Sequence, residues 1–515
     1  MLIKFLAKRS FPEYVLIFLT LAFYLIFLIH KIDLTTVDLG RHIRNGEFIL
    51  KDKDVLFTNF YSFSNPTFST INHHWASGVI FYEIWKFCGF LGLQLFFILV
   101  SLVTFFVTYR IGIAKIGIYL SSLLALLIIP LLAERTEIRP EMFSYFLAVI
   151  FYYFLTYGSK GKDKKLFLLP VLQLLWVNLH VYFFLGPFLI FVFILEKLIS
   201  KKWKKALNLV WIFLTTLLVC LVNPSFVSGA IQPLLIFKEY GYRVLENQPL
   251  LFIEKLIFTP NFIIFKIVFG LLVLSIIVRL AKRKEVNVFT DIILLLFFSV
   301  LGFLAIRNFY LFGMFGYIIL TNNIAVIWPD LPLRLTERLR TMALIIVTSS
   351  LILIPLINFQ TKFSGWSGWG LGLIEGNSRA ANFFIKNKLK GPLFNNYDIG
   401  GYLIFYLFPK ERVFVDNRPE AYPVNFFQKE YIPMQEKELN WQEKLKKYKF
   451  NTTFFSMTDK TTWAQTFLIN RIKDKEWVPV YADKYAIIFL RNNGENKNLI
   501  SRFRLPENYF KITGI

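Results

Sequence analysis

Ionisable residues gather in two stretches near the N-terminus, TTVDLGRHIRNGEFIL at 35–50 and NHHWASGVIFYEIW at 72–85, and both lie beside strongly apolar segments. Charged groups are costly near a bilayer and are usually retained for a purpose. A carboxylate can take a proton from a hydroxyl group, whereas arginine and histidine can hold an anion. The two stretches therefore indicate a membrane-surface active site containing Asp38, Arg41, His42, His73, His74 and Glu83.

These residues also have plainer interpretations. Asp38 suits a helix cap or a solvated loop, and the His73–His74 pair suits an anchor at the membrane interface. The pair has no third ligand at helical spacing, so no metal is assigned to it. Asp52 and Asp54 have the D-x-D spacing that many sugar-transfer enzymes use for a divalent ion, but they lie in a polar turn between lysines. A divalent cation is therefore one possible cofactor, and the sequence indicates no other.

A further charged group lies in ERTEIRPEMF at 134–143, which contains Arg135, Glu137 and Arg139. Short loops on the extracytoplasmic side of a membrane protein usually contain few arginines. Arg135 and Arg139 are exceptions to this rule. Planar guanidinium groups suit bidentate binding of phosphate. An internal Arg–Glu network joining two helices explains the same residues, and both interpretations stay open.

Other polar residues lie near expected helix ends on the same side, namely Asn178, His180 and Arg307. Arg307 suits a specific contact with a lipid phosphate, or it can extend to bulk headgroups. The sequence lacks G-x-S-x-G, Walker, G-x-G-x-x-G and H-E-x-x-H motifs. Their absence argues against serine hydrolases, P-loop ATP use, dinucleotide enzymes and zinc proteases in their usual forms.

The composition indicates that most of the chain lies in a lipid bilayer, because 56% of the 515 residues are hydrophobic and 59 are phenylalanine. Crossing the hydrocarbon core takes ~20 apolar residues. We expect eleven transmembrane helices, at 12–30, 90–109, 112–133, 142–157, 166–179, 181–199, 206–222, 261–280, 288–306, 309–328 and 341–358. The predicted fold class is a polytopic α-helical membrane protein with a small C-terminal extracytoplasmic α/β domain.

Basic residues decide the orientation, because cytoplasmic loops carry the excess of Lys and Arg. Every second loop is basic, with clusters at 4–9, 110–115, 160–165, 201–205, 279–284 and 334–340. This alternation predicts a cytoplasmic N-terminus and an extracytoplasmic C-terminal region in a multi-pass cell-membrane protein. Since the net charge of +24 lies in these short clusters, membrane lipids are the expected partner and nucleic acid is not.

Two outer segments are long. The first, at 31–89, is expected to contain an amphipathic helix around Trp75 to Trp85, and the second, at 223–260, suits a surface-lying or re-entrant piece. Cys88 and Cys220 have no metal-ligand spacing and are expected to be two buried thiols.

In the tail, charged residues become frequent and short strand-like runs alternate with helical patterns. This change predicts a transmembrane domain at 1–375 and an extracytoplasmic α/β domain at 376–515. Helical patterns occur at 378–389 and 438–448, and strand-like runs occur at 401–408, 411–416, 452–457 and 485–490. Asp398, before Gly400 and Gly401, and Asp416 with Arg418 are placed near strand ends, where site residues of α/β folds are common. An Asp–Arg bridge that fixes two loops explains Asp416 and Arg418 as well.

These segments, taken in order, resemble the C-type glycosyltransferase superfamily, whose members use polyprenyl-phosphate-linked sugars. The resemblance spans nearly the whole chain, although each motif is short. It rests on DLGRH in the first outer loop, NFYSFSNP, HHWASGVIFYEIW, Arg139-Pro140-Glu141, W-x-N-x-H at 176–180, NNYDIGGYLIF and the V-D-x-R of Asp416 and Arg418.

The resemblance implies that Asp38 is the catalytic base and that a lipid-linked sugar donor is the main partner. This chain departs from members with paired acids in the first loop, because Leu39 and Gly40 follow Asp38. It also has His74-Trp75 where others have His-Glu-Trp. A related protein with the fold but without the transferase activity is therefore a second reading.

The function hypothesis is transfer of a sugar from a polyprenyl-phosphate donor to an acceptor hydroxyl, by an inverting displacement at the extracytoplasmic face. The alternative is a non-catalytic protein that transports a lipid-linked glycan or serves as an assembly subunit. Grouping of the ionisable residues on one membrane face favours the transferase over the transporter.

Overall fold

The computed structural model describes residues 10–158, 163–235, 238–282, 288–331, 337–356, 368–506 and 509–510. The chain divides into two compact units. The helical unit comprises Met1–Lys31, Gln94–Pro233 and Val244–Leu371, and the mixed unit comprises Ile32–Leu93, Leu234–Arg243 and Gly372–Ile515. Thus most of the predicted first outer loop belongs to the same unit as the C-terminal tail.

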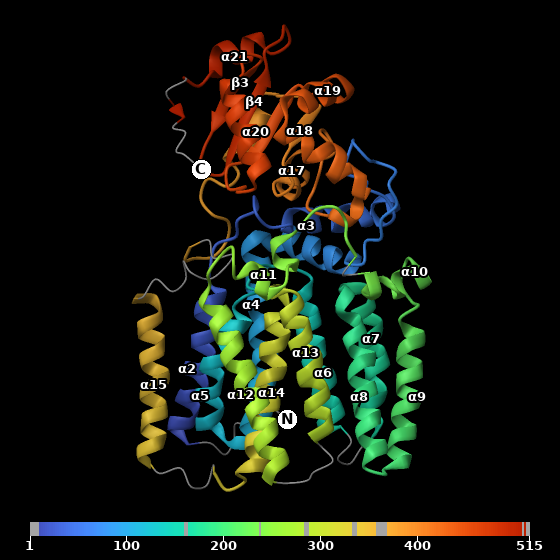
Figure 1. The fold of residues 1–515 in the computed structure, drawn as a ribbon, viewed down its shortest axis with the longest axis vertical. Coiled ribbons are helices and arrows are strands. Elements are labelled where there is room, and N and C mark those ends of the chain that lie inside the picture. The colour runs from blue at the N-terminus through green and yellow to red at the C-terminus, as the bar shows by residue number, and fades with distance from the viewer. Residues whose placement is uncertain are drawn as a thin grey trace. The chain divides into compact units, whose positions relative to one another are not determined.

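Long apolar helices build the helical unit and run side by side (Figure 1). They are α2 (Phe11–Leu28), the second part of α4 (Trp75–Ile116), α5 (Ile118–Leu132), α6 (Glu141–Tyr157), α7 (Leu168–Leu179), α8 (Leu185–Ile199), α9 (Trp203–Val219), α12 (Pro260–Lys282), α13 (Val288–Leu304), α14 (Phe309–Ile327) and α15 (Glu337–Leu356). Short helices α10 (Phe226–Ala230) and α11 (Leu250–Ile253) lie in the predicted second outer segment.

Length and composition identify five described helices that can cross a membrane, at Phe11–Leu28, Trp75–Ile116, Val181–Ile199, Pro260–Lys282 and Ile306–Ile327. Shorter apolar helices accompany them. Each of the eleven predicted segments contains a helix in the described part of the chain. The predicted fold class, a polytopic α-helical membrane protein, is confirmed. Parts of the basic clusters at 4–9, 160–165, 279–284 and 334–340, and positions 357–358, lie outside the described residues.

Helix α14 is the central helix of this unit, since 78% of its most apolar window is buried. Aromatic packing surrounds it, as in the stacked rings of Phe298 and Phe315, whose centroids are 3.9 Å apart. Buried charges are paired here: Arg279 of α12 donates to Asp291 of α13 at 2.6 Å and to Asn323 of α14 at 2.8 Å. Such pairing is required because an isolated charge in an apolar interior is very costly.

The predicted amphipathic helix forms the first part of α4 and continues into the apolar part across a kink at Gly89. This residue has a φ of 62°, a conformation that glycine adopts without steric cost. The prediction of two buried thiols is wrong for Cys88, which is exposed one residue before the kink, whereas Cys220 is buried.

The mixed unit contains a four-stranded sheet with the order β1-β2-β4-β3. The strands are β1 (Leu393–Asn395), β2 (Thr452–Ser456), β3 (Trp477–Ala482) and β4 (Ala486–Arg491). β1 pairs in parallel with β2, and the other two pairs are antiparallel. The helices of the unit are α3 (Leu39–Ile49), α16 (Arg379–Lys386), α17 (Gly400–Leu407), α18 (Pro433–Glu436), α19 (Glu438–Tyr448), α20 (Thr462–Lys473) and α21 (Lys497–Phe503).

An aromatic core fixes β1 against these helices. Phe394 on β1 lies 5.2 Å from Trp441 and 5.3 Å from Phe450, measured between ring centroids. Trp441 is also stacked on Phe450 at 5.5 Å. Burial of large rings is a major stabilising term in a domain of this size.

Two of the predicted strands are wrong. Residues 401–408 lie almost entirely in α17, because a short, fully buried apolar run has no periodicity that separates helix from strand. Residues 411–416 form no named strand, and Val413 makes only an isolated bridge with Ser62. The strand-like runs at 452–457 and 485–490 correspond to β2 and β4, and the predicted helices at 378–389 and 438–448 correspond to α16 and α19.

Candidate functional site

Asp38 stands at the N-cap of α3 but makes no side-chain cap hydrogen bond. Its Oδ2 atom instead accepts from Arg41 Nη2 at 2.8 Å and lies 3.2 Å from His42 Nε2. Helical spacing explains both contacts, because positions three and four residues along the helix lie on the same face. The side chains of Arg41 and His42 are 6% and 1% exposed, whereas that of Asp38 is 17% exposed. The carboxylate is therefore held by buried groups, on a side chain that keeps part of its surface exposed.

Arg41 has a second partner in the tail. Its Nε atom donates to Asn417 Oδ1 at 3.2 Å. The two chain segments approach closely through α17: a Cβ atom added at Gly401 would lie 3.4 Å from Asp38 Cα, and one added at Gly400 would lie 2.5 Å from Asp416 Cα. Gly400 and Gly401 thus begin α17 and permit close backbone packing.

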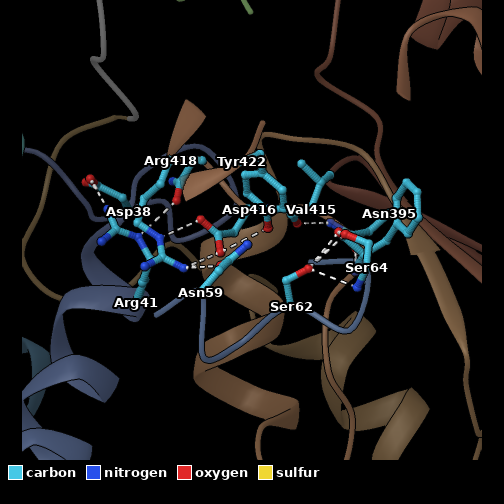
Figure 2. Close-up of polar contacts among 12 residues, drawn as sticks. Asp38, Arg41, Asn59, Ser62, Ser64, Asn395, Val415, Asp416, Arg418 and Tyr422 are labelled. Carbon is cyan, nitrogen blue, oxygen red and sulfur yellow. Dashed lines mark hydrogen bonds and ion pairs between the residues drawn. The ribbon is translucent and has the colours of Figure 1, made fainter. Parts of the chain in front are cut away.

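Asp416 and Arg418 form a bidentate ion pair in the interior of the mixed unit (Figure 2). Arg418 Nε and Nη2 lie 2.8 and 2.7 Å from the two carboxylate oxygens. Arg418 Nη2 also donates to Asn59 Oδ1 at 2.9 Å, and the Tyr422 hydroxyl donates to Asp416 Oδ2 at 3.3 Å. The predicted bridge between Asp416 and Arg418 is therefore present within one loop, and the Arg418–Asn59 hydrogen bond joins that loop to the segment after α3.

His74 packs beside His42, and His73 packs beside His74. The rings of His42 and His74 lie 5.7 Å apart, and those of His73 and His74 lie 4.0 Å apart. Glu83 is half-buried on α4. Among the described residues, no group of three His, Cys, Asp or Glu side chains is arranged to hold a metal ion. Asp52, of the D-x-D spacing, caps a short helix by accepting from the Asp54 backbone N–H at 3.0 Å.

The arginines at 135 and 139 form an ion-pair network within the helical unit. Arg135 pairs with Glu141 and, at 2.7 Å, with Glu246, while Arg139 pairs with Glu246 at 2.9 Å and Glu137 at 2.7 Å. Burial acts to raise the pKa of Glu246, but the two guanidinium groups outweigh it and lower that pKa to about 2. One carboxylate thus bridges both arginines.

Asn178, His180 and Arg307 also belong to the helical unit. Asn178 Nδ2 donates to the carbonyl oxygens of Leu174 and Val222 at 2.9 and 3.0 Å. His180 Nδ1 accepts from the Tyr182 N–H at 3.4 Å and lies 2.8 Å from the Ser144 hydroxyl. The Arg307 guanidinium lies 5.7 Å from the Tyr182 ring centroid. Asn178 and His180 thus form hydrogen bonds that link neighbouring helices of this unit.

Asp398 lies in the turn before α17, in the mixed unit. Burial and the neighbouring carboxylate of Asp459 raise the pKa of Asp398 to about 7. Asp459 accepts from Asn396 Nδ2 at 2.8 Å, and the Tyr242 ring stacks on Tyr397 at 4.0 Å. This pair of acids with aromatic neighbours forms a second polar cluster of the mixed unit.

The sequence-based candidates omit several residues of these clusters, among them Asn59, Glu246, Asn417, Tyr422 and Asp459. Asn417 lies between two candidates in VFVDNRPEAY, and that position could have suggested it. Glu246 lies in the predicted second outer segment, but no spacing connects it with residues 135 and 139. Its contacts arise only from the tertiary fold.

No family model matches the chain, and no curated protein matches it. Solved structures do match in fold. The archaeal oligosaccharyltransferase AglB from Archaeoglobus fulgidus, in complex with an inhibitory peptide and a dolichol-phosphate, has a TM-score of 0.61 at 10% identity, covering 95% of this chain and 75% of that chain. The Archaeoglobus fulgidus oligosaccharyltransferase tethered to an acceptor peptide with the NVT sequon has a TM-score of 0.62 at 12% identity, with the same coverage.

The same oligosaccharyltransferase in a complex with Zn and sulfate has a TM-score of 0.56 at 11% identity, covering 93% of this chain and 73% of that chain. At these identities the likeness concerns the fold. The fold is similar to that of this archaeal oligosaccharyltransferase. The chain is similar to AglB in architecture, and its activity has to be argued from its own residues.

Proposed function

We propose that this protein transfers a sugar from a polyprenyl-phosphate-linked donor to an acceptor hydroxyl at the extracytoplasmic membrane face. The supporting observation is the Asp38 carboxylate, which buried Arg41 and His42 hold in one orientation on a side chain that is 17% exposed. A helix-capping aspartate would direct its carboxylate to the backbone, and Asp38 does not. The C-type fold adds support for a lipid-linked donor, as does the dolichol-phosphate present in one AglB complex.

In the proposed reaction, the acceptor oxygen attacks the anomeric carbon as the bond from that carbon to the phosphate oxygen breaks. The acceptor proton passes to the Asp38 carboxylate, and the bonding electrons leave with the prenyl phosphate. A single displacement inverts the anomeric configuration. General-base catalysis of this kind contributes typically ~10²–10⁴-fold to the rate. Arg41 supports the role because a guanidinium at 2.8 Å stabilises the ionised carboxylate that accepts the proton.

The departing phosphate needs positive charge, and the Arg135–Arg139 pair is the group we assign to it, with Arg307 as a further donor. Both arginines have an N–H group directed at the same carboxylate, that of Glu246. A phosphate has the same preference for two guanidinium groups and carries more charge, so it can replace that carboxylate. Charge that develops in the transition state is stabilised by such prearranged donors.

The remaining candidates are assigned to substrate binding. His73, His74 and Glu83 lie on or beside the first part of α4, in the same unit as Asp38. Asp398 is offered as a contact for the acceptor, because a half-buried carboxyl beside tyrosines can bind a hydroxyl group. No step of the proposed reaction is assigned to a divalent cation.

The test uses the purified full-length protein with a panel of undecaprenyl-phosphate-linked sugars, and with membranes from cells lacking the protein as the source of acceptor. Release of undecaprenyl phosphate and labelling of acceptor are measured. Asp38→Asn should reduce turnover by ~100-fold or more. Glu436→Gln is the control, since Glu436 is an exposed acid of the same unit with no assigned role. Equal turnover of wild type and Asp38→Asn would remove Asp38 from the base role.

The alternative function as a transporter or assembly subunit predicts a different result in cells. Under that reading, Asp38→Asn leaves the glycans of the cell envelope unchanged, whereas deletion of the gene alters them. The transferase predicts the same glycan defect for the deletion and for Asp38→Asn.

A further inference from the structure

Asn417 connects the tail of the chain to the Asp38–Arg41 pair. Arg41 uses two separate donors: Nη2 binds Asp38 and Nε binds Asn417 Oδ1. Arg41 is 5% exposed, so water has little access to its guanidinium group. A guanidinium held at two points has a fixed plane, whereas one held at a single point can rotate about its long side chain.

The loop that carries Asn417 is itself rigidly held. Asp416, immediately before it, is fully buried and paired with Arg418, immediately after it. Arg418 is tied in turn to Asn59, and Asp416 to Tyr422 (Figure 2). The Asp416 backbone N–H also donates to the Tyr422 hydroxyl at 2.9 Å. The backbone on both sides of Asn417 therefore has little freedom.

A second acidic residue lies near Arg41. Glu420 is half-buried two residues after Arg418; burial raises its pKa, and the nearby charges of Arg41 and Arg418 act in the opposite direction. Asn417 accepts a hydrogen bond from Arg41 Nε through its amide oxygen, which keeps the guanidinium plane directed at Asp38. Loss of this acceptor would leave Arg41 free to turn toward Glu420.

We propose that Asn417 is a positioning residue, which fixes the Arg41 guanidinium through its amide oxygen and thereby sets the orientation of the Asp38 carboxylate. This inference rests on the proposed function, since it assumes that Asp38 takes a proton in the reaction. The buried Asp416–Arg418 pair is the anchor that gives Asn417 its position. The role requires an oxygen acceptor at this position and no particular charge.

The test compares Asn417→Ala and Asn417→Asp in the full-length protein, in the transfer assay with undecaprenyl-phosphate-linked sugars. Asn417→Ala should lower kcat by ~10- to 100-fold and leave the KM for the donor unchanged, because misplacement of a catalytic group by ~1 Å has costs of that order. Asn417→Asp keeps an oxygen for Arg41 and should restore most of kcat. Asn382→Ala is the control, because Asn382 is an exposed asparagine on α16 of the same unit.

A merely structural role predicts another pattern. If Asn417 only stabilises the fold, Asn417→Ala lowers the unfolding temperature and the amount of active protein but leaves kcat per folded molecule unchanged. That result would overturn the proposal. Equal losses in Asn417→Asp and Asn417→Ala would also overturn it, because rescue by the retained oxygen is the specific expectation.

The double variant Asp38→Asn/Asn417→Ala separates this inference from the function on which it rests. If Asn417 acts through Asp38, the double variant should be no slower than Asp38→Asn alone, because coupled residues have non-additive effects. Multiplied losses would show that Asn417 acts by another route. Full activity of Asp38→Asn by itself would reject the proposed base, whatever the result at position 417.

Discussion

Asp38 occupies the N-cap of α3, yet its carboxylate binds Arg41 one turn along the helix at 2.8 Å, with no side-chain bond to the helix backbone. N-cap side chains normally accept from backbone N–H groups of the first turn. The first turn of α3 therefore gives up a stabilising cap worth ~1 kcal/mol. Local rules are most often broken at functional sites, which agrees with the role proposed for Asp38.

Replacement of Gly400 by alanine should impair both folding and transfer. A Cβ atom there would lie 2.5 Å from Asp416 Cα and 2.6 Å from the Val415 carbonyl oxygen, both of them backbone atoms. Overpacking of this kind costs typically ~1–3 kcal/mol, and the loop would have to move. Gly494→Ala is the control, because nothing lies within 4 Å of the added atom. Thermal unfolding that is the same for the two variants would contradict the close packing of α17 on this loop.

Breaking the buried ion pair should cost far more stability than breaking an exposed one. Asp416→Ala leaves the Arg418 charge buried without its bidentate partner, a loss of ~3–5 kcal/mol in comparable cases. Glu443→Ala removes only the exposed partner of Lys444 and should change stability by less than ~1 kcal/mol. Scanning fluorimetry of the full-length protein measures both. A midpoint for Asp416→Ala equal to that of the control would show that the pair does not anchor the loop.

Removal of the Glu246 charge should strengthen binding of a lipid phosphate. In the structure this carboxylate bridges Arg135 and Arg139, so it competes with an incoming phosphate. Glu246→Gln should therefore bind undecaprenyl phosphate several-fold more tightly, as measured by microscale thermophoresis in detergent. Glu254→Gln, which removes the exposed partner of Lys266 in the same unit, should leave binding unchanged. Weaker binding by Glu246→Gln would favour the purely structural network.

The pH dependence of stability should report on Asp398. Burial and Asp459 raise its pKa to about 7, above the ordinary value near 4, so the folded state holds a proton that the unfolded state has already lost. The contribution of Asp398 to the free energy of unfolding is therefore highest below pH ~4. It decreases as the pH rises toward ~7, by up to ~1.4 kcal/mol per pH unit.

Asp398→Asn removes the titrating group and keeps a similar shape. We expect the variant to match wild type near pH 4 and to unfold at a higher temperature than wild type at pH 8. The midpoints of thermal unfolding at both pH values provide the measurement. Curves that remain parallel across this range would show that Asp398 titrates normally.

Prediction from the sequence succeeded where the pattern was long and failed where it was short. The eleven apolar segments contain helices because ~20 consecutive apolar residues have few alternatives to a helix in a bilayer. Residues 401–408 were assigned to a strand because eight apolar residues show no distinguishing period, and α17 resulted from packing against α3 and the 415–418 loop. Strands β1 and β3 lack the strong alternation that would mark them.

The candidate site divides in the same way. Asp38, Arg41 and His42 are neighbours on one helix, so their contact follows from helical spacing and could be expected from the sequence. The bridge between Asp416 and Arg418 was one of two readings, and the structure contains it. The contacts of Asn59 with Arg418 and of Glu246 with Arg135 join residues that are 359 and 111 positions apart. No local sequence pattern predicts them.

The sequence by itself determined the membrane character, the helical segments and the residue types that could do chemistry, because hydrophobic length and local spacing act over a few turns of chain. Only the tertiary structure decided that the first outer segment folds with the C-terminal tail, and that Asn417 meets Arg41 there. The physical reason is that such contacts depend on close backbone packing at Gly400 and Gly401 and on burial of paired charges. Both are properties of the assembled unit and of no single segment.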